Sequence, residues 1–388
     1  MRQSYSTITP SSVHQIARGV LATTLKCEAY KKSVKLNQLL DLLLLVACTG
    51  RTLFAMVRRF AFSHETARQA VQANLPKLPV LTQRLNDALY AVTAFSRRDR
   101  RRRWTVAIDT HNVPYYGSRS TPHIVGGQKK QGTKYFHSYA TAILIHRHRR
   151  YTVGLVTVTK GTKPHELVDQ LLTQIRSRGL KIGGVVLDSA FDSGETILLL
   201  QQLDVSYAVP VRRKGNKPNR RNDCFSHLSG TVETISWVTE KTRKPVATLV
   251  LVWKRPTDQQ TRVFAFSGWG EASAKSQLRR AWLSRQRYRQ RFGIETSYRQ
   301  KNQARGWTTS RSAEYRLLLE GLALLVRQLW VRLTEEITHT CGLKPSAWVS
   351  ELPLMEMVEW LADAIKTPNA PKRSISINSM TITTHATP

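Results

Sequence analysis

The sequence predicts a mixed α/β fold, in which a sheet with helices on its faces is interrupted by a β-rich insertion and preceded by a helical domain. Residues 104–211 alternate between strand and helix periodicity in the order βββαβαβ, which describes a mixed sheet covered by helices. Residues 213–272 contain three segments rich in β-branched and aromatic residues, as strands are. Helical periodicity appears within the first 96 residues and again from Ser273.

The length of 388 residues supports more than one domain, because single hydrophobic cores stop growing near ~250–300 residues. Pro, Ser, Thr and Asn dominate after Thr367, so we expect roughly the last twenty residues to be disordered. The predicted ranges are 1–96 (helical domain), 97–212 (first part of the core), 213–272 (β-rich insertion), 273–340 (second, helical part of the core) and 341–388 (C-terminal helix and disordered tail).

The predicted elements of the core follow from apolar spacing. The strands are Trp104–Asp109, His137–His146, Tyr151–Thr159, Ile182–Asp188 and Val205–Val211, and the helices are His165–Arg178 and Gly194–Leu203. The first three strands form a meander. The insertion is predicted to contribute the strands Thr231–Val238, Ala247–Lys254 and Arg262–Ser267.

The balance of charge points to a polyanionic partner. Lysine and arginine number 60 against 26 acidic residues, a formal charge of +34, which a compact protein avoids unless it binds negative charge. The basic residues are spread among aromatic ones along the chain, which favours an extended nucleic-acid track. Ribosomal and membrane-surface proteins are also basic, but neither class explains the acidic motifs described below.

Other classes of protein are disfavoured by composition. The four cysteines are far apart and form none of the close pairs of zinc sites or redox motifs, so we expect reduced structural thiols. The most apolar run, Leu39–Ala47, is shorter than the ~20 residues of a membrane span, and no charged-then-apolar leader opens the chain. The sequence therefore predicts a cytoplasmic protein with no membrane partner.

Three short helices are predicted between Leu36 and Leu75, before Pro76 and Pro79 end the run. Ser63 is a suitable N-cap for the third helix. Its outward face carries His64, Arg68, Gln69 and Gln72, and arginine and glutamine suit base edges in the major groove. The interpretation is either a helix-turn-helix or an ordinary three-helix bundle with a polar exterior.

A second basic feature is the run Arg97–Arg103, immediately before the first core strand. It is either a solvated linker or a contact for backbone phosphates, and we favour phosphate contact, with Arg101 and Arg102 as candidates.

Two aspartates end predicted core strands: Asp109 ends the first and Asp188 ends the fourth. If these strands are neighbours, the carboxylates converge, and both stay ionised only if a cation neutralises their repulsion. Hard oxygen ligands suit Mg²⁺ or Mn²⁺. The alternative for each residue alone is a turn or cap.

A predicted helix over Trp282–Gln303 places Tyr288, Arg291 and Glu295 on one face, because they are three and four residues apart. Arg299 extends that face. The alternative is an exposed helix held by intrahelical ion pairs.

Three segments resemble the acidic motifs of DDE transposases. They are Ala107–Gly117 (AIDTHNVPYYG), Val186–Phe191 (VLDSAF) and Tyr288–Arg299 (YRQRFGIETSYR). The likeness is closest to the bacterial and archaeal insertion-sequence group whose first motif is Asp followed by Pro-Tyr-Tyr-Gly, within the Tyr-Arg-Glu-Lys superfamily. The resemblance covers residues 104–330.

The resemblance implies an RNase H-like core and a cut-and-paste DNA transposase. It implies two Mg²⁺ (or Mn²⁺) ions held by Asp109, Asp188 and Glu295, hydrolysis at transposon ends, and attack of the freed 3′-hydroxyl on target DNA. Arg291 would neutralise phosphate oxygens and Tyr288 would contact DNA near the cut. The implied partners are double-stranded DNA, as terminal inverted repeats and target, and a second copy of the chain, in the nucleoid. Candidates to stabilise a flipped base are Trp237, Trp253 and Trp269.

The chain departs from the family pattern at the final lysine, which is expected at Asn302 but stands one position early, at Lys301. Lys301 points about 120° away from Glu295, so we assign its phosphate contact to Arg299. The second motif also has Ser189 and Ala190 where the family has Arg or Gly. His111 is expected to orient its loop. The alternative functions are a stand-alone RNase H-like nuclease and an inactive DNA-binding transposase relic.

Overall fold

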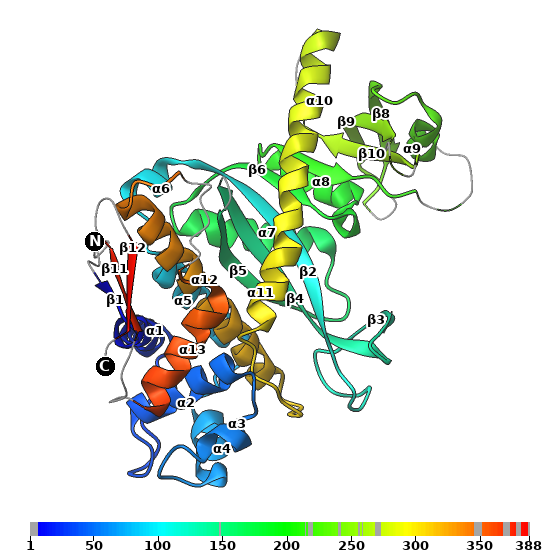
Figure 1. Ribbon diagram of the computed structural model, residues 1–388. Helices are drawn as coiled ribbons and strands as arrows, with labels where there is room; N and C mark the ends of the chain where they lie inside the picture. The colour runs from blue at the N-terminus through cyan, green and yellow to red at the C-terminus, as the bar shows by residue number, and fades with distance from the viewer. Residues whose placement is uncertain are drawn as a thin grey trace.

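The computed structural model describes residues 7–146, 149–213, 215, 220–239, 242–254, 257, 259–267, 273–344, 351–367, 373–377 and 382–386. A nine-stranded mixed sheet runs through the molecule in the order β3-β4-β2-β6-β7-β10-β9-β8, with β5 also paired to β4 (Figure 1). Its strands are β2 (Arg103–Pro114), β3 (Val125–Lys130), β4 (Thr133–His146), β5 (Arg149–Val158), β6 (Lys181–Leu187), β7 (Tyr207–Pro210), β8 (Val232–Val238), β9 (Pro245–Lys254) and β10 (Thr261–Phe266).

The pairing at the centre of the sheet is the one that the acidic motifs require. Strands β2 and β6 are parallel neighbours, and their register ends with Ile108 beside Leu187. Asp188 follows β6 directly, as predicted. Asp109 was wrongly expected to end its strand, because β2 continues to Pro114 along β4, which begins four residues earlier than predicted. At Asp109, β2 is therefore no longer paired with β6 but is still paired with β4.

The β-rich segment extends the core sheet. β10 pairs antiparallel with β7, β9 pairs with β10, and β8 forms the far edge. All three predicted strands are present, but they add to the same sheet on which the aspartates lie. Figure 1 shows these strands at one end of the molecule, with α9 (Arg220–Asp223) beside them. The 3-10 turn η2 (Cys224–Ser226) contacts β10.

Helices cover both faces of the sheet. On one face, α7 (Pro164–Ser177) packs against β4, β5 and β6, and α8 (Gly194–Gln202) packs against β9 and α7. Trp104, Val106 and Ile108 of β2 belong to the same core cluster. On the other face, α10 (Ala274–Arg289), the 3-10 turn η3 (Gln290–Phe292) and α11 (Gly293–Asn302) cross β6, β7 and β2. The predicted continuous helix over Trp282–Gln303 is therefore wrong in its middle, where η3 tightens the chain.

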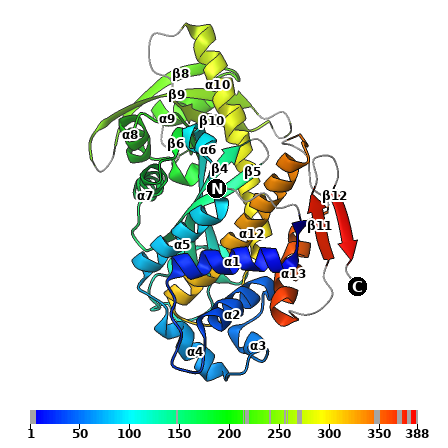
Figure 2. The same ribbon diagram turned by 90° about the vertical axis from the view of Figure 1, so that its left-hand side faces the viewer.

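The N-terminal helices share a core with the C-terminal ones. α12 (Ala313–Thr340) packs against α5 (Leu78–Thr93) and α2 (Leu36–Thr49), and α13 (Leu354–Lys366) packs against α1 (Pro10–Leu25) and α2. Figures 1 and 2 show this group, with α3 (Leu53–Val57) and α4 (His64–Ala73), at the opposite end from β8. Pro79 lies in the first turn of α5, a position where proline needs no amide donor, so it starts this helix.

Two further segments differ from expectation. The basic run begins as a short helix, α6 (Arg97–Arg101), because Ser96 and Asp99 form a capping box. The C-terminal tail was expected to be disordered, yet β11 (Arg373–Ile377) and β12 (Ile382–Ala386) form a sheet with β1 (Thr7–Ile8). The isoleucines of β11 and the isoleucine and threonines of β12 supply the β propensity, and pairing with the distant N-terminus stabilises this sheet. Among the described residues, no helix has the length and apolar character of a membrane span.

Candidate active site

Asp109, Asp188 and Arg291 meet at the centre of the sheet, and we name them the acidic cluster. Arg291 Nη1 donates to Asp109 Oδ2 at 2.9 Å, and Arg291 Nη2 lies 3.6 Å from Asp188 Oδ1. Asp109 arrives on β2, Asp188 at the end of β6, and Arg291 on η3, across 182 residues of sequence. The two aspartates therefore converge as predicted, and a single guanidinium lies against both.

The electrostatics of Asp109 leave it short of positive charge. Burial raises the pKa of Asp109 to about 6; Arg291 opposes this shift, while the negative charges of Asp188 and Glu295 add to it. The carboxylate also accepts a hydrogen bond from the amide of Thr110 at 2.8 Å. An added cation would remove the repulsion that these carboxylates impose on one another.

Glu295 lies one turn beyond Arg291, in the first turn of α11, with an exposed side chain. Its charge acts on Asp109, but no direct contact joins it to either aspartate. Within the part of the chain that the structure describes, no three His, Cys, Asp or Glu side chains already lie close enough together to hold a metal ion. The donor set still suits a divalent cation, because two oxygen ligands converge beside a third carboxylate on an open side.

Two further predicted site residues differ in exposure. Tyr288 is buried against Phe264, and its ring lies 5.5 Å from the guanidinium of Arg291. Its ring therefore packs against Arg291, and little of its surface is accessible to DNA. Arg299 is exposed on α11, as its assigned phosphate contact requires.

A second ionic group, the sealed cluster, consists of His111, Lys301 and Glu320. Lys301 Nζ contacts Glu320 Oε1 and lies 3.0 Å from His111 Nε2, which is itself 2.8 Å from Glu320 Oε1. Burial opposes the charge of Glu320, but Lys301 and His111 outweigh it and hold the pKa of Glu320 below its usual range. Burial lowers the pKa of Lys301 to about 8. The buried side chain of Lys301 thus contacts His111 of β2 and Glu320 of α12, and it is not accessible to a DNA phosphate.

Sequence reasoning missed Glu320. It is a lone acid in an apolar stretch of α12, Leu317–Leu325, and a charged residue in a buried helix signals a partner. Tyr298 connects the two clusters: its hydroxyl donates to the backbone oxygen of Asp109 at 3.2 Å, and its ring lies 4.6 Å from that of His111.

The predicted DNA-binding residues outside the core are spread widely. On α4, Arg68 pairs with Glu65 and Gln72, and Gln69 bonds Glu65 and Tyr30. The α4 face lines a groove of about 670 Å³ with Trp307 and Tyr315. Arg101 is exposed on α6, and Arg102 lies over the Trp104 ring, at the start of β2. The structure therefore leaves these basic groups at different places around the sheet, away from the acidic cluster.

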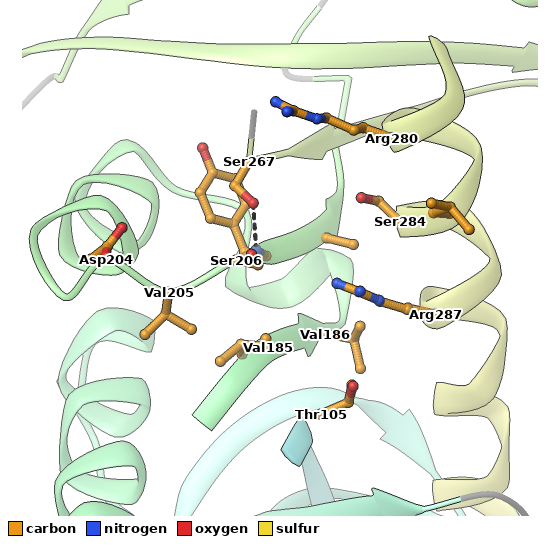
Figure 3. A pocket seen from close by; sticks show the side chains of 14 residues that line it. Thr105, Val185, Val186, Asp204, Val205, Ser206, Ser267, Arg280, Ser284 and Arg287 are labelled. Carbon is orange, nitrogen blue, oxygen red and sulfur yellow. Dashed lines mark hydrogen bonds between the residues drawn. The ribbon is translucent and has the colours of Figure 1, made fainter. Parts of the chain in front are cut away.

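A basic face of α10 leads toward the acidic cluster. Figure 3 shows Arg280, Ser284 and Arg287 projecting from α10 into a pocket of about 360 Å³, with Arg280 on the side of Ser267 and Arg287 on the side of Val186 of β6. These residues and Arg291 follow one another at three- and four-residue spacing. Intrahelical ion pairing was the alternative interpretation of this helix from the sequence, but the pocket gives Arg280 and Arg287 an open side.

The three tryptophans proposed to stabilise a flipped base differ in their surroundings. The Trp253 ring lies 3.8 Å from the Arg285 guanidinium, so one face of it is covered. Trp237 is partly buried against the main core. Trp269 lies outside the described residues.

Comparisons with known proteins agree with this geometry. A family model described as the transposase DDE domain matches residues 100–326, more than half of the chain. No curated protein matches the sequence. A solved structure described as the cryo-EM structure of the piggyBac transposase synaptic complex with hairpin DNA is similar in fold, with a TM-score of 0.57 and 11% identity, over 92% of this chain and 80% of that one. The predicted RNase H-like fold class is confirmed, and the chain belongs to the DDE transposases, enzymes that cut DNA and transfer its strands with divalent metal ions.

Proposed function

We propose that Asp109, Asp188 and Glu295 hold two Mg²⁺ (or Mn²⁺) ions in cut-and-paste transposition. The observation that supports this most directly is the convergence of Asp109 and Asp188 on adjacent parallel strands, beside one shared guanidinium. The negative charges of Asp188 and Glu295 both act on Asp109, so we propose Asp109 as the ligand that both ions would share. When bound, the ions would activate water or a 3′-hydroxyl and stabilise the leaving oxygen.

The protein groups supply position and charge. Tyr298 holds the backbone oxygen of Asp109, which fixes the strand on which the shared ligand lies. Arg291 compensates the aspartates in the metal-free protein, and with metal bound its guanidinium becomes available for a nonbridging phosphate oxygen. Glu295 is exposed one turn further on and can complete the ligand set from α11.

The substrate that we propose is double-stranded DNA, as transposon ends and target. The similar piggyBac structure is a synaptic complex with hairpin DNA, and by that likeness we propose a complex of two copies of this chain with two DNA ends. The face of α10 that carries Arg280, Arg287 and Arg291 supports a phosphate path into the site. Arg68, Gln69 and Gln72 on α4, with Arg101 and Arg102, are proposed further contacts, and DNA binding would place the protein in the nucleoid.

The test is incubation of the protein with its own flanking DNA and Mg²⁺, scored for 3′ nicks that disappear with a chelator. Joining of the freed ends to plasmid DNA distinguishes a transposase from a stand-alone nuclease. A relic would bind DNA but never nick it, and Asp109→Asn would then change nothing measurable. Nicking that survives Asp109→Asn would overturn the site assignment.

A further inference from the structure

Gly293 begins α11 with an ordinary helical backbone, so its lack of a side chain needs another reason. Its φ of −63° and ψ of −16° are open to any residue, and glycine is a poor helix former relative to alanine. A Cβ at this position would lie 2.6 Å from Nε of Arg150 and 3.2 Å from its guanidinium carbon. The glycine therefore leaves room for the Arg150 side chain.

Arg150, on β5, reaches the turn that carries Arg291. Its Nη2 donates to the backbone oxygen of Gln290 at 3.2 Å, and its Nη1 donates to the backbone oxygen of Arg149 at 2.9 Å. The Gln290 oxygen also accepts from the amide of Gly293, as in a 3-10 turn. The carbonyl that precedes Arg291 thus has two donors, and one of them comes from a strand. A side chain that bonds into a helix at this point accounts for the change of helix type.

The backbone of Arg150 is itself held by α12. Arg327, only 3% exposed, donates from Nη1 to the backbone oxygen of Arg150 at 3.0 Å and from Nε to Gln300 Oε1 of α11 at 3.2 Å. Burial, together with the nearby charge of Arg150, lowers the pKa of Arg327 to about 9. Burial lowers the pKa of Arg150 as well. Two neighbouring cations thus bear an electrostatic cost, and their N–H groups join β5, η3 and α11 next to Arg291.

We infer that Arg150 is a positioning residue for the acidic cluster: it holds η3 so that Arg291 lies against Asp109 and Asp188. Arg291 is the residue that follows the carbonyl bonded by Arg150. Release of that carbonyl would let η3 relax toward a continuous helix, and the guanidinium would shift from the aspartates. A displacement of about 1 Å at a reacting centre lowers rates about 100-fold. This inference deepens the proposed function and rests on it, because Arg150 acts only through Arg291.

Gly293→Ala tests the contact without removing a charge. The added methyl group meets the far end of the flexible Arg150 side chain, which can move aside, so the urea midpoint should stay close to that of the wild type. The nicking rate at saturating DNA and Mg²⁺ should fall roughly 10- to 100-fold, while the Kd for DNA in chelator is unchanged. In an Arg150→Ala background the space is empty, so adding Gly293→Ala should lower nicking by less than about twofold more.

Amide hydrogen exchange in the metal-free protein reports on η3 without any need for activity. Arg150→Ala and Gly293→Ala should each speed exchange in a peptide spanning residues 288–294 about tenfold. Arg178→Ala is the matched control: Arg178 is also half-buried and donates to a backbone oxygen of β5, that of Val153, at 3.3 Å. It makes no hydrogen bond to η3 in the described part of the chain, so exchange at η3 and nicking should both remain at the wild-type rate.

Wild-type exchange at η3 in both variants would overturn the inference. Faster exchange with an undiminished nicking rate would overturn it too, since η3 would then be held by Arg150 without consequence for the acidic cluster. Independent, multiplicative losses of nicking in the double variant would show that Gly293 and Arg150 do not act through one contact. A wild-type protein that never nicks would refute the proposed function, and exchange alone would then decide whether Arg150 holds η3.

Discussion

Two ionic clusters lie two residues apart on one face of β2, and they differ in access and in charge balance. In the acidic cluster, one guanidinium faces two carboxylates, and the Asp188 side chain is 33% exposed. In the sealed cluster, Lys301 and Glu320 are each 1% exposed and match one charge with one charge. Asp109 and His111 share a face because strand side chains alternate.

This difference in charge balance gives the two clusters different roles: the acidic cluster can bind a cation, and the sealed cluster stabilises the fold. A balanced, fully buried ion pair gains nothing from a further ion, whereas an excess of negative charge at an accessible position attracts one. The sealed cluster instead ties β2 to α11 and α12, which fixes the strand that carries Asp109. Substitutions in the two clusters should therefore have opposite signatures, in activity for one and in stability for the other.

The largest expected effect is on catalysis in the acidic cluster. Asp109→Asn removes the proposed shared ligand, so nicking should fall at least about 1,000-fold, given that metal ions contribute several kcal/mol to such barriers. DNA affinity should be retained, because the basic surfaces are untouched. Asp169→Asn, an exposed carboxylate on α7, is the control and should nick at the wild-type rate. The measurement is the single-turnover nicking rate with saturating Mg²⁺.

The second effect is on stability in the sealed cluster. Lys301→Met leaves the Glu320 charge buried without its main partner and should cost about 3–5 kcal/mol of unfolding free energy in urea titrations. The double variant Lys301→Met/Glu320→Leu should recover most of that loss, because no charge then remains unpaired. Arg299→Met on the same helix is exposed and should change stability by less than about 0.5 kcal/mol. A harmless Lys301→Met would mean that the pair does not support the fold.

A third, smaller effect concerns pH and metal in the acidic cluster. Burial raises the pKa of Asp109 to about 6, so the folded metal-free protein holds this proton more tightly than the unfolded chain does. Asp109 should therefore reduce stability by about 1–3 kcal/mol as pH rises from about 4 to 6. The loss should be absent in Asp109→Asn and reversed in the wild type by divalent ions. Thermal unfolding of both proteins across this range, with and without Mg²⁺, measures it.

The smallest effect is on DNA binding at an exposed cation of α11. Arg299→Ala should weaken binding to terminal DNA a few-fold, uniformly across sequences, and lower the slope of log affinity against log salt by about one. Lys366→Ala on α13 is the control. Unchanged affinity and slope for Arg299→Ala would remove its assigned phosphate contact.

The sequence alone predicted the part of the site that depends on strands. Alternation located the strands that lead to Asp109 and Asp188, but their adjacency was only a condition of the prediction, consistent with the RNase H-like core that the resemblance implies. The contact of Arg291 with both aspartates could not be predicted, because it depends on η3, a change of helix type that the periodicity does not reveal. The Lys301–Glu320 pair and the β1-β11-β12 sheet join segments through tertiary packing, which local patterns do not encode.

The central claim is that Asp109, Asp188 and Glu295 hold one metal centre, and Fe²⁺-directed cleavage of the protein backbone tests it most directly. With Fe²⁺ in place of Mg²⁺, locally generated radicals should cut the chain near residues 109, 188 and 295. All three cuts should be suppressed by excess Mg²⁺ and lost in Asp109→Asn. Cuts that spare the region of Glu295, or that persist unchanged in Asp109→Asn, would contradict a centre built from these three carboxylates.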